Sequence, residues 1–540
     1  MNNIIEYWHK NKQFVIILSI ITIIGAIIRL ISCYWGYPLL LHPDEFAIVD
    51  SAIDMLRRHS WESFVFYRPD QFETKCCSIL FSVISWIKFH APAYDTFNDY
   101  KLMYHLIARG FTSIFGIALI PLSVLLVGKI VEGIEINKMW TQYVVAILFA
   151  FSPIFVRHSA YATPDIPLTF FVVLFSYFFL EYLEKGEIKD FVICSIIVGI
   201  ATTIKYPALI LSIPLAFMVI YRECLYTKKY LNILKYAGYS IFIIFFVMFI
   251  IAPNLFTDFN SVIKCFINEA KSTRVGAYGL GFWGNLFYYL KTVVENLGYI
   301  TIIPFILGLV LIFKNKNFKY WVFLIGFIYW ICMSILSLHV LRWGIPIFAF
   351  YNILVAIGLG YILSLKNIKF NKLIFNIGII INIIVLLNVF LSAICITKSN
   401  TLQTNLYLAQ KIFEENNVNK EDFVYEGYTP FAPILYNPVA PKLFEFVEGK
   451  VKPIDKYSSK KYFIMSNTHS NRYFREAKRY SYEVSIYNAI NSNYELSYQL
   501  KADGNYLQKS FALKNIFYSI KYIFSKYHST GSTILIYKLK

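Results

Sequence analysis

The chain has 540 residues, of which 57% are hydrophobic and only 16% are charged. An ordinary soluble domain is about 45–50% apolar and about 25% charged, so this composition excludes a soluble globular protein, a disordered chain and a collagen or coiled-coil fibre. The net charge of +18 is compatible with a nucleic-acid binder or with the basic loops of a membrane protein, and the position of the basic residues decides between them.

Eleven apolar runs are candidates for membrane-spanning helices, each of which needs about 20 mainly apolar residues. They lie at roughly 13–33, 104–128, 140–157, 164–183, 188–204, 206–222, 236–253, 295–313, 320–338, 343–364 and 373–397. The first run lacks a small-residue cleavage site, so we interpret it as a membrane span and not as a signal peptide.

Basic residues in alternate short loops predict a cytoplasmic amino terminus. The sixteen that share one side are Lys10, Lys12, Lys129, Lys138, Lys185, Lys189, Arg222, Lys228, Lys229, Lys235, Lys314, Lys316, Lys319, Lys366, Lys369 and Lys372. The opposite short loops hold little beyond Arg157, Lys205 and Arg342. Because basic flanks resist translocation, the first set is cytoplasmic and no nucleic acid is needed to explain the charge. Two long loops, 34–103 and 254–294, and the tail 401–540 then lie outside.

The first outer loop begins with the residues Leu41-His42-Pro43-Asp44-Glu45-Phe46. Pro43 suits the first position of a helix, with His42 before it. Apolar residues at helical spacing between 46 and 56 predict an amphipathic helix along the membrane surface. Asp44 and Glu45 fall in its first turn, where helix capping alone explains a carboxylate. Further along, Lys75 precedes an apolar segment, 76–89, that we expect to form a second surface helix.

A second carboxylate stands in the same setting. Asp165 follows Pro164 at the outer start of the fourth span, and the turn before it contains Arg157 and His158. An acidic residue near the bilayer is costly unless it faces a cavity or a partner. The two acidic helix starts therefore favour one shared aqueous site.

Four cations lie on or near this side. Lys205, followed by Tyr206, and Arg342 occupy outer turns, Arg109 is near the outer end of the second span, and Lys75 is in the first loop. Snorkelling to the interface explains each cation alone. Beside two carboxylates, however, the group suits an anion such as a lipid phosphate. A carboxylate that deprotonates an acceptor and cations that hold a phosphate leaving group indicate glycosyl transfer.

The remaining segments add little chemistry. The glycines of loop 254–294 match no phosphate-binding motif, and we expect a mobile loop over the site or a plain connector. The eight cysteines form no CxxC, which argues against a disulfide scaffold or a zinc module. In the tail, helical spacing at 402–416 and alternating runs at 461–465 and 532–537 predict a small extracytoplasmic α/β domain.

The chain resembles the GT-C glycosyltransferases of the dolichyl-phosphate-mannose–protein mannosyltransferase and aminoarabinose transferase superfamily. It is most similar to the bacterial phospholipid carrier-dependent glycosyltransferases. The resemblance covers residues 13–400 and is carried by LHPDEF at 41–46, RGFTSIFG at 109–116, SPIFVRHSAYATPDIPLTFF at 152–171, TTIKYPALILSIPL at 202–215 and HVLRWGIPIFAF at 339–350. It implies a polytopic GT-C domain over 1–400, followed by the tail.

The resemblance also implies roles for individual residues. Asp44 matches the general base of the first loop, with Glu45 as its usual neighbour, and Asp165 matches the second acidic position. The implied ligands of the donor phosphate are Lys75, Arg109, Lys205 and Arg342, with His42, Arg157, His158 and Tyr206 as further site residues. The family often has two prolines near 76, whereas this chain has Cys76-Cys77. The implied reaction inverts the sugar and uses no nucleotide sugar.

Two other functions remain open from the residues alone. A transporter or flippase of lipid-linked sugars needs the same cations without chemistry, and a glycan ligase or polymerase uses a lipid diphosphate donor. No cofactor is required, and a divalent metal near His42, Asp44 and Glu45 is conceivable but lacks a trusted ligand spacing. The expected partners are a polyprenyl-phosphate sugar, a protein, glycolipid or wall-polymer acceptor, and the bilayer. The expected location is the cell membrane, with the site facing outside.

Overall fold

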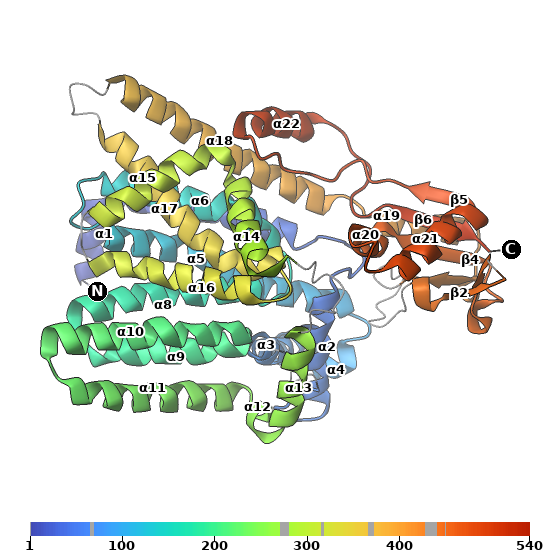
Figure 1. Ribbon diagram of the computed structural model, residues 1–540, viewed down its shortest axis with the longest axis horizontal. Coiled ribbons are helices and arrows are strands. Elements are labelled where there is room, and N and C mark those ends of the chain that lie inside the picture. Colours follow the sequence, from blue (N-terminus) through green and yellow to red (C-terminus); the bar gives the residue numbers. More distant parts are fainter. Residues whose placement is uncertain are drawn as a thin grey trace.

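The structure is a computed structural model that describes residues 2–64, 68, 70–270, 280–314, 318–365, 372–426, 440–448 and 450–539. Long helices run side by side in a bundle, and short helices and a small sheet gather at one end of it (Figure 1). The chain is thus helical over its first 400 residues and mixed α/β in its tail, as the sequence predicts.

The helices of the first 400 residues alternate between long apolar elements and short connecting ones. Their bounds are α1 Asn2–Ser32, α2 Pro43–Arg57, α3 Gln71–Phe89, α4 Ala93–Thr96, α5 Lys101–Ile130, α6 Lys138–Phe151, α7 Pro153–Ser159, α8 Asp165–Lys185, α9 Ile188–Ile204, η1 Tyr206–Leu211, α10 Ser212–Arg222, η2 Glu223–Thr227, α11 Tyr230–Ile251, α12 Asn254–Thr257, α13 Phe259–Ala270, α14 Gly281–Leu297, η3 Tyr299–Thr301, α15 Ile302–Lys314, η4 Phe318–Trp321, α16 Val322–Ile335, η5 Leu341–Gly344, α17 Ile345–Ser364 and α18 Lys372–Thr401.

Each of the eleven predicted spans coincides with a helix or a helix pair. Among the described residues, eight helices are long and apolar enough to cross a membrane, or up to ten if each of two bent pairs counts as one span. The bent pairs are α6 with α7, at 47°, and α14 with the helix Tyr299–Lys314, at 103°. The remaining run forms α9, which has 17 residues. A polytopic helical membrane protein is confirmed, while the number eleven and the cytoplasmic amino terminus stay predictions.

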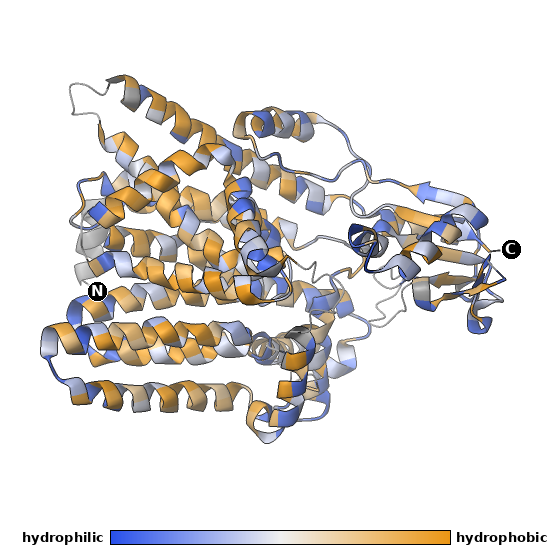
Figure 2. Cartoon of the chain, viewed as in Figure 1, coloured by the Kyte–Doolittle hydropathy of each residue, from blue (hydrophilic) through white to orange (hydrophobic). Residues whose placement is uncertain are grey.

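The long helices of the bundle are mostly hydrophobic along their length (Figure 2). Some of their large apolar side chains are exposed on the outside of the bundle, such as Phe242 and Phe246 of α11. Inside, α15 and α17 cross closely, because Gly308 and Gly358 have no Cβ at the crossing. A Cβ on either glycine would collide with a backbone carbonyl of the facing helix. Small residues at such crossings are typical of helices that associate within a bilayer.

The bend between α6 and α7 follows from Pro153. This residue has no N–H, so the carbonyl of Phe149 loses its helical partner. The guanidinium of Arg29, which is buried in α1, donates instead to the carbonyls of Phe149 and Ala150, at 2.8 Å each. The side chain of Asn296 accepts from the N–H of Ile154 at 3.0 Å. Side chains from α1 and α14 therefore satisfy the opened turn, as an apolar surrounding requires.

The helices of the first outer loop, α13 and the sheet of the tail lie at the end of the bundle opposite the amino terminus (Figure 1). The predicted topology also puts loops 34–103 and 254–294 and the tail on one side. The predicted surface helix is α2, and the ring Nδ1 of His42 accepts from the N–H of Asp44 at 3.3 Å as its amino-terminal cap. The second is α3, which includes Lys75.

The predicted tail elements are confirmed, in a sheet of mixed direction. Its four strands run in the order β1-β4-β6-β5, with β1 parallel to β4 and the other pairs antiparallel, and β2 and β3 form a separate hairpin. The tail elements are α19 Asn405–Glu415, η7 Lys420–Asp422, β1 Phe423–Tyr425, η8 Ala440–Lys442, β2 Phe444–Val447, β3 Lys450–Pro453, η9 Asp455–Tyr457, β4 Tyr462–Ser466, α20 Asn467–Arg475, α21 Ser481–Asn493, β5 Glu495–Leu500, α22 Ala512–Phe524 and β6 Ile534–Lys538.

Two segments qualify the sequence predictions. The proposed mobile stretch with Gly276 and Gly279 lies outside the described residues, whereas Gly281 and Gly284 belong to α14. In the tail, α22 leaves the sheet and packs along α18 of the bundle (Figure 1). The division into domains at residue 400 stays a prediction.

Candidate active site

The two predicted acidic motifs meet through one arginine. Arg342 Nη2 lies 2.6 Å from Asp44 Oδ2, and its Nε lies 4.0 Å from Asp165 Oδ2. Lys205 Nζ donates to Asp165 Oδ1 at 2.6 Å. Four residues that are far apart in sequence, and that the sequence analysis assigned to one site, are therefore in contact.

The row of charges continues into the first outer loop. Arg68 Nη2 lies 3.2 Å from Asp44 Oδ1 and 3.2 Å from Asp70 Oδ2. The hydroxyl of Tyr206, next to Lys205, donates to the carbonyl of Arg68 at 3.2 Å. We call the alternating series Lys205, Asp165, Arg342, Asp44, Arg68 and Asp70 the ionic chain. It links the first outer loop to η1, η5 and the start of α8.

Five of the six members of the ionic chain sit where a helix starts or ends, and Arg68 lies in the loop before α3. Asp44 is in the first turn of α2 and Asp165 is the first residue of α8, where the helix dipole favours a carboxylate. Lys205 follows the last residue of α9, and Arg342 is in η5, just before α17. Asp70 directly precedes α3. Spans that end at one level thereby present opposite charges to one another.

Burial and pairing compete at these side chains. Burial alone would raise the pKa of the Asp44 carboxyl, but the guanidinium groups of Arg342 and Arg68 hold that pKa well below its usual value. At Lys205, burial lowers the pKa of the ammonium, and Asp165 opposes that shift. Asp44 is therefore a carboxylate at neutral pH, but one that is neutralised by two cations and is a weak base in this state.

Glu45 and Arg109 form a second, fully buried pair beside Asp44. Arg109 donates from Nε and Nη2 to the two Glu45 oxygens at 2.9 Å each, and from Nη1 to the carbonyls of Cys33 and Trp35. The N–H of Ala162 also donates to Glu45. Although burial acts in the opposite direction, Arg109 lowers the pKa of Glu45 to about 2. The pair ties α2 to α5, to the end of α1 and to the loop before α8.

This geometry does not favour the predicted contact of Arg109 with a donor phosphate. Four of its N–H groups already point at protein acceptors, and a phosphate would have to displace Glu45. The sequence could not distinguish the two roles, because a lone arginine in an apolar helix indicates either a ligand or a buried partner.

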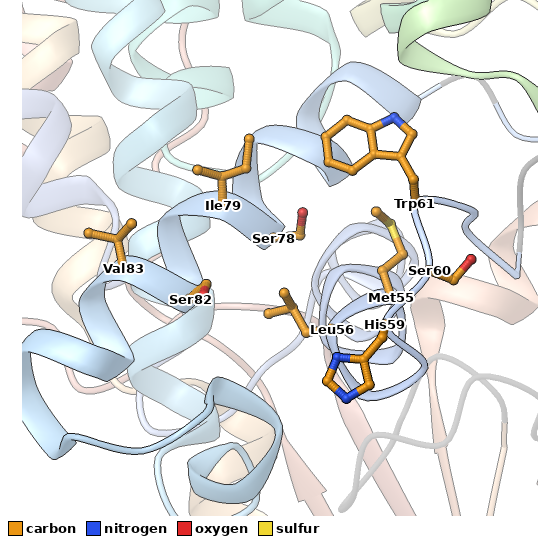
Figure 3. A pocket seen from close by; sticks show the side chains of 9 residues that line it. All are labelled: Met55, Leu56, His59, Ser60, Trp61, Ser78, Ile79, Ser82 and Val83. Carbon is orange, nitrogen blue, oxygen red and sulfur yellow. The ribbon is translucent and has the colours of Figure 1, made fainter.

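Lys75 lies apart from the ionic chain. Its ammonium donates to the carbonyl of Trp61, lies 5.2 Å from the centre of that indole and 3.6 Å from Met55 Sδ. Met55 and Trp61 line a cavity of about 390 Å³ between α2 and α3, together with Ser60 and Ser78 (Figure 3). Burial lowers the pKa of Lys75 to about 8. The structure therefore does not bring Lys75 to the carboxylates, and its predicted phosphate contact has no support here.

The predicted histidines lie beside the ionic chain. The ring centres of His42 and Tyr161 are 5.0 Å apart, and those of His158 and Tyr161 are 6.0 Å apart. Arg157 is partly exposed on the same turn of α7 as His158. These residues surround a tyrosine that the sequence analysis did not select.

Three acidic or basic residues near the site were missed. Arg68 and Asp70 extend the ionic chain, and Glu73 is buried on the first turn of α3 with neither oxygen hydrogen-bonded among the described residues. Burial raises the pKa of Glu73 well above its usual value, with Asp70 adding to the shift. A signal was present, because Asp70 follows a proline, as Asp44 and Asp165 do.

A metal set is not assembled in the part of the chain that the structure describes. There, no three His, Cys, Asp or Glu side chains lie close enough together to hold an ion. The residues of the conceivable metal site are engaged elsewhere: His42 caps α2, Asp44 binds two guanidinium groups and Glu45 binds Arg109. Whether a metal is needed stays a prediction.

Comparisons with known proteins agree with this architecture. Residues 101–252 match the family model described as dolichyl-phosphate-mannose-protein mannosyltransferase. A search among curated proteins gave no match.

Solved structures provide a wider comparison. The archaeal oligosaccharyltransferase AglB from Archaeoglobus fulgidus, in complex with an inhibitory peptide and a dolichol-phosphate, superimposes with a TM-score of 0.55 and 12% identity, over 92% of this chain and 74% of that one. The apo oligosaccharyltransferase of the same organism gives 0.54 and 12%, over 89% and 72%. ArnT from Cupriavidus metallidurans bound to undecaprenyl phosphate gives 0.46 and 11%, over 97% and 98%.

At such identities the superposition on AglB shows a shared fold, and the family model adds an independent match within the bundle. The two acidic motifs, at Asp44 and Asp165, also meet at Arg342 at one end of that fold. The chain therefore shares the fold of AglB, a GT-C glycosyltransferase, and this fold and the partial family match agree with the predicted resemblance to the GT-C superfamily.

Proposed function

We propose that the chain is a glycosyltransferase that moves a sugar from a polyprenyl-phosphate donor to an acceptor hydroxyl at the outer face of the membrane. The observation that carries the proposal is the position of the Asp44 carboxylate between Arg342 and Arg68, at 2.6 and 3.2 Å. The proposed base therefore contacts both proposed phosphate-binding groups directly. They lie at the end of an apolar bundle, which suits a lipid-linked substrate.

The reaction needs one bond to form as another breaks. The acceptor oxygen attacks the anomeric carbon from the face opposite the phosphate, and its proton passes to Asp44. The bond between the anomeric carbon and the phosphate oxygen breaks, and the phosphate leaves with the electron pair. Arg342, Arg68 and Lys205 stabilise the growing negative charge on that phosphate. Direct displacement of this kind inverts the configuration of the sugar.

The low pKa of Asp44 gives the donor a second role. With both guanidinium groups on it, Asp44 is a poor acceptor for a hydroxyl proton. A donor phosphate that draws Arg342 and Arg68 toward itself weakens these ion pairs, and the pKa of Asp44 then rises. Donor binding would in this way prepare the base, and the acceptor would be activated only when a donor is present.

Asp165 and Lys205 have complementary parts in this scheme. The Asp165 carboxylate holds Lys205 at 2.6 Å and faces Arg342 at 4.0 Å. Without Asp165, and before a donor phosphate binds, Lys205 and Arg342 would lie side by side with no negative charge between them. Asp165 thus keeps Lys205 and Arg342 in place, and Lys205 supplies a third positive charge for the phosphate.

The comparisons support the class of donor and leave its sugar open. AglB is described in complex with a dolichol-phosphate and an inhibitory peptide, and the matching family is named for dolichyl-phosphate-mannose as a donor. A polyprenyl monophosphate with a hexose or a pentose is therefore the donor we propose. A lipid diphosphate donor is the competing possibility, since it would use the same cations.

Reconstitution of the purified protein in vesicles tests the proposal. The vesicles receive an extract of polyprenyl-linked sugars with candidate peptide, glycolipid or wall-polymer acceptors, and mass spectrometry detects a new glycosidic product and the lipid released. We expect lipid monophosphate to be released together with the product. Release of lipid diphosphate would identify a ligase or polymerase, and sugar movement across the bilayer without a new bond would identify a flippase.

Asp44→Asn is the decisive variant, and Asp54→Asn is its matched control. Asp54 belongs to the same helix but pairs with the partly exposed Arg58, away from the ionic chain. We expect Asp44→Asn to lower the rate by about 10²–10⁴-fold, the usual contribution of a general base. Asp54→Asn should leave the rate unchanged. Full activity of Asp44→Asn, at normal expression, would contradict the assignment of the base.

A further inference from the structure

Helix α22 of the tail buries polar residues, Asn515 and Ser519 among them, and leaves large apolar side chains exposed. Leu513, Phe517, Ile520 and Phe524 recur at spacings of four, three and four, so they form one stripe along the helix. All four are exposed, Phe517 by 72% and Phe524 by 84%. We call these four residues the apolar stripe. In water, a helix would turn such a stripe inward.

The buried side of α22 is instead hydrogen-bonded to α18. Asn515 Nδ2 donates to Asn388 Oδ1 at 2.9 Å and to Ser392 Oγ at 2.8 Å. The hydroxyls of Tyr506 and Ser519 lie 2.8 Å apart in the same buried network. Polar side chains that join helices while apolar ones face outward are typical of segments surrounded by lipid.

The contacts also fix the level at which α22 lies. Asn388 and Ser392 belong to the second half of the candidate span Phe375–Thr401. The ammonium of Lys398, near the end of that span, donates to three carbonyls at the end of α22, those of Tyr522, Ile523 and Ser525. The start of α22 is thus beside the middle of the span, and its end is beside the end of the span.

The apolar stripe also continues the outer surface of α18. On that helix, the exposed apolar side chains are Leu373, Ile377, Ile380, Ile383 and Leu387. In the second half of α18, the side chains of Asn388, Ser392, Cys395 and Lys398 contact α22 instead. The exposed Lys521, in the last turn of α22, lies beside the stripe and is long enough to reach phosphate headgroups. Its positive charge favours an anionic lipid surface.

We propose that α22 is inserted into the leaflet on the side of the sheet, with the apolar stripe against lipid acyl chains and its first turn deeper than its last. The tail would then be held to the bilayer by residues 505–524, which enter and leave on the same side.

Photo-crosslinking of the full-length chain in vesicles of phosphatidylglycerol and phosphatidylethanolamine tests this placement. The variant Phe517→p-benzoylphenylalanine should give a lipid adduct by mass spectrometry. Phe242, exposed on the spanning helix α11, provides the positive control, and Tyr482, exposed on α21 of the tail, provides the control in water. We expect adducts at 517 and 242 and none at 482.

Three results would overturn the placement. One is a variant at 517 that gives no lipid adduct while the variant at 242 does. Another is an adduct at 517 with a second copy of the chain, which would make the stripe a protein contact. The third concerns direction: the same probe at Leu513 should attach further along the acyl chain than at Phe524, and the reverse order would contradict the predicted depth.

Discussion

Arg342 Nη2 lies 2.6 Å from Asp44 Oδ2, so the turn before α17 is bonded to the first turn of α2. The same guanidinium faces Asp165, and a lysine ammonium, as a single point charge on a narrower group, cannot match both contacts. We expect Arg342→Lys to lower kcat/KM by about 10²-fold, within the range that loss of a group stabilising the transition state produces. Arg58→Lys, at a partly exposed pair on α2, is the control and should have little effect.

Lys205 and Lys75 should differ sharply, although the sequence assigns both to the phosphate. Lys205→Met removes a cation of the ionic chain and leaves Asp165 buried without its partner, so transfer should be lost. Lys75→Met removes a contact with a carbonyl and an indole away from the carboxylates, so the rate per folded molecule should stay within about threefold. Transfer rates of both variants, measured at increasing donor concentration, test this difference. An equal loss of rate in the two variants would indicate that Lys75 also binds the donor phosphate.

The pair of Glu45 and Arg109 should matter for stability. Glu45→Ala leaves a buried guanidinium without its partner, which costs about 3–5 kcal/mol. Replacement of both by methionine removes both charges and should restore part of that loss, although the N–H of Ala162 stays unsatisfied. Thermal unfolding in detergent compares the variants. A double variant less stable than Glu45→Ala would contradict the view that Glu45 stabilises the fold by pairing with the charge of Arg109.

Glu426 in the tail predicts a pH dependence of stability. Burial raises its pKa from 4.5 to about 7, against the hydroxyl of Tyr487, which donates to it. Between these values the folded tail holds one more proton than the unfolded tail. The free energy of unfolding should therefore fall by roughly 3 kcal/mol as the pH rises from about 4.5 to about 7, and then level off.

Proteolysis of the tail at increasing urea, at pH 5.5 and 7.5, measures that dependence in the full-length protein. The wild type should resist better at pH 5.5. Glu426→Gln should lose most of the difference, whereas Glu495→Gln, at an exposed position of β5, should keep it. An unchanged difference in Glu426→Gln would assign the pH dependence to other groups.

Local patterns predicted much of this fold. The apolar spacing after Pro43 predicted α2, and the runs of apolar residues predicted the long helices, because both depend on neighbours within a few residues. The meeting of Asp44 and Asp165 could also be predicted, since a proline precedes each at a helix start on the same side. A carboxylate at such a place is costly without a cation nearby.

Long-range pairings could not be predicted in this way. Nothing near Arg109 in the sequence indicates that Glu45 takes up its guanidinium, and nothing near Asn515 indicates Asn388 as its partner. Arg68 was overlooked because it lies in a loop with no periodic pattern. These contacts depend on how distant segments pack, and a polar residue has the same local signature whether it binds a substrate or another residue.

The corner between α6 and α7 limits how the second acidic motif can be transplanted. Its shape depends on Arg29 and Asn296, which belong to other helices and replace the hydrogen bonds that Pro153 interrupts. A chimera that receives residues 152–171 alone would carry the acid without the geometry. A working graft needs the arginine and the asparagine as well, so the smallest exchangeable unit around Asp165 includes parts of α1 and α14 together with α6, α7 and α8.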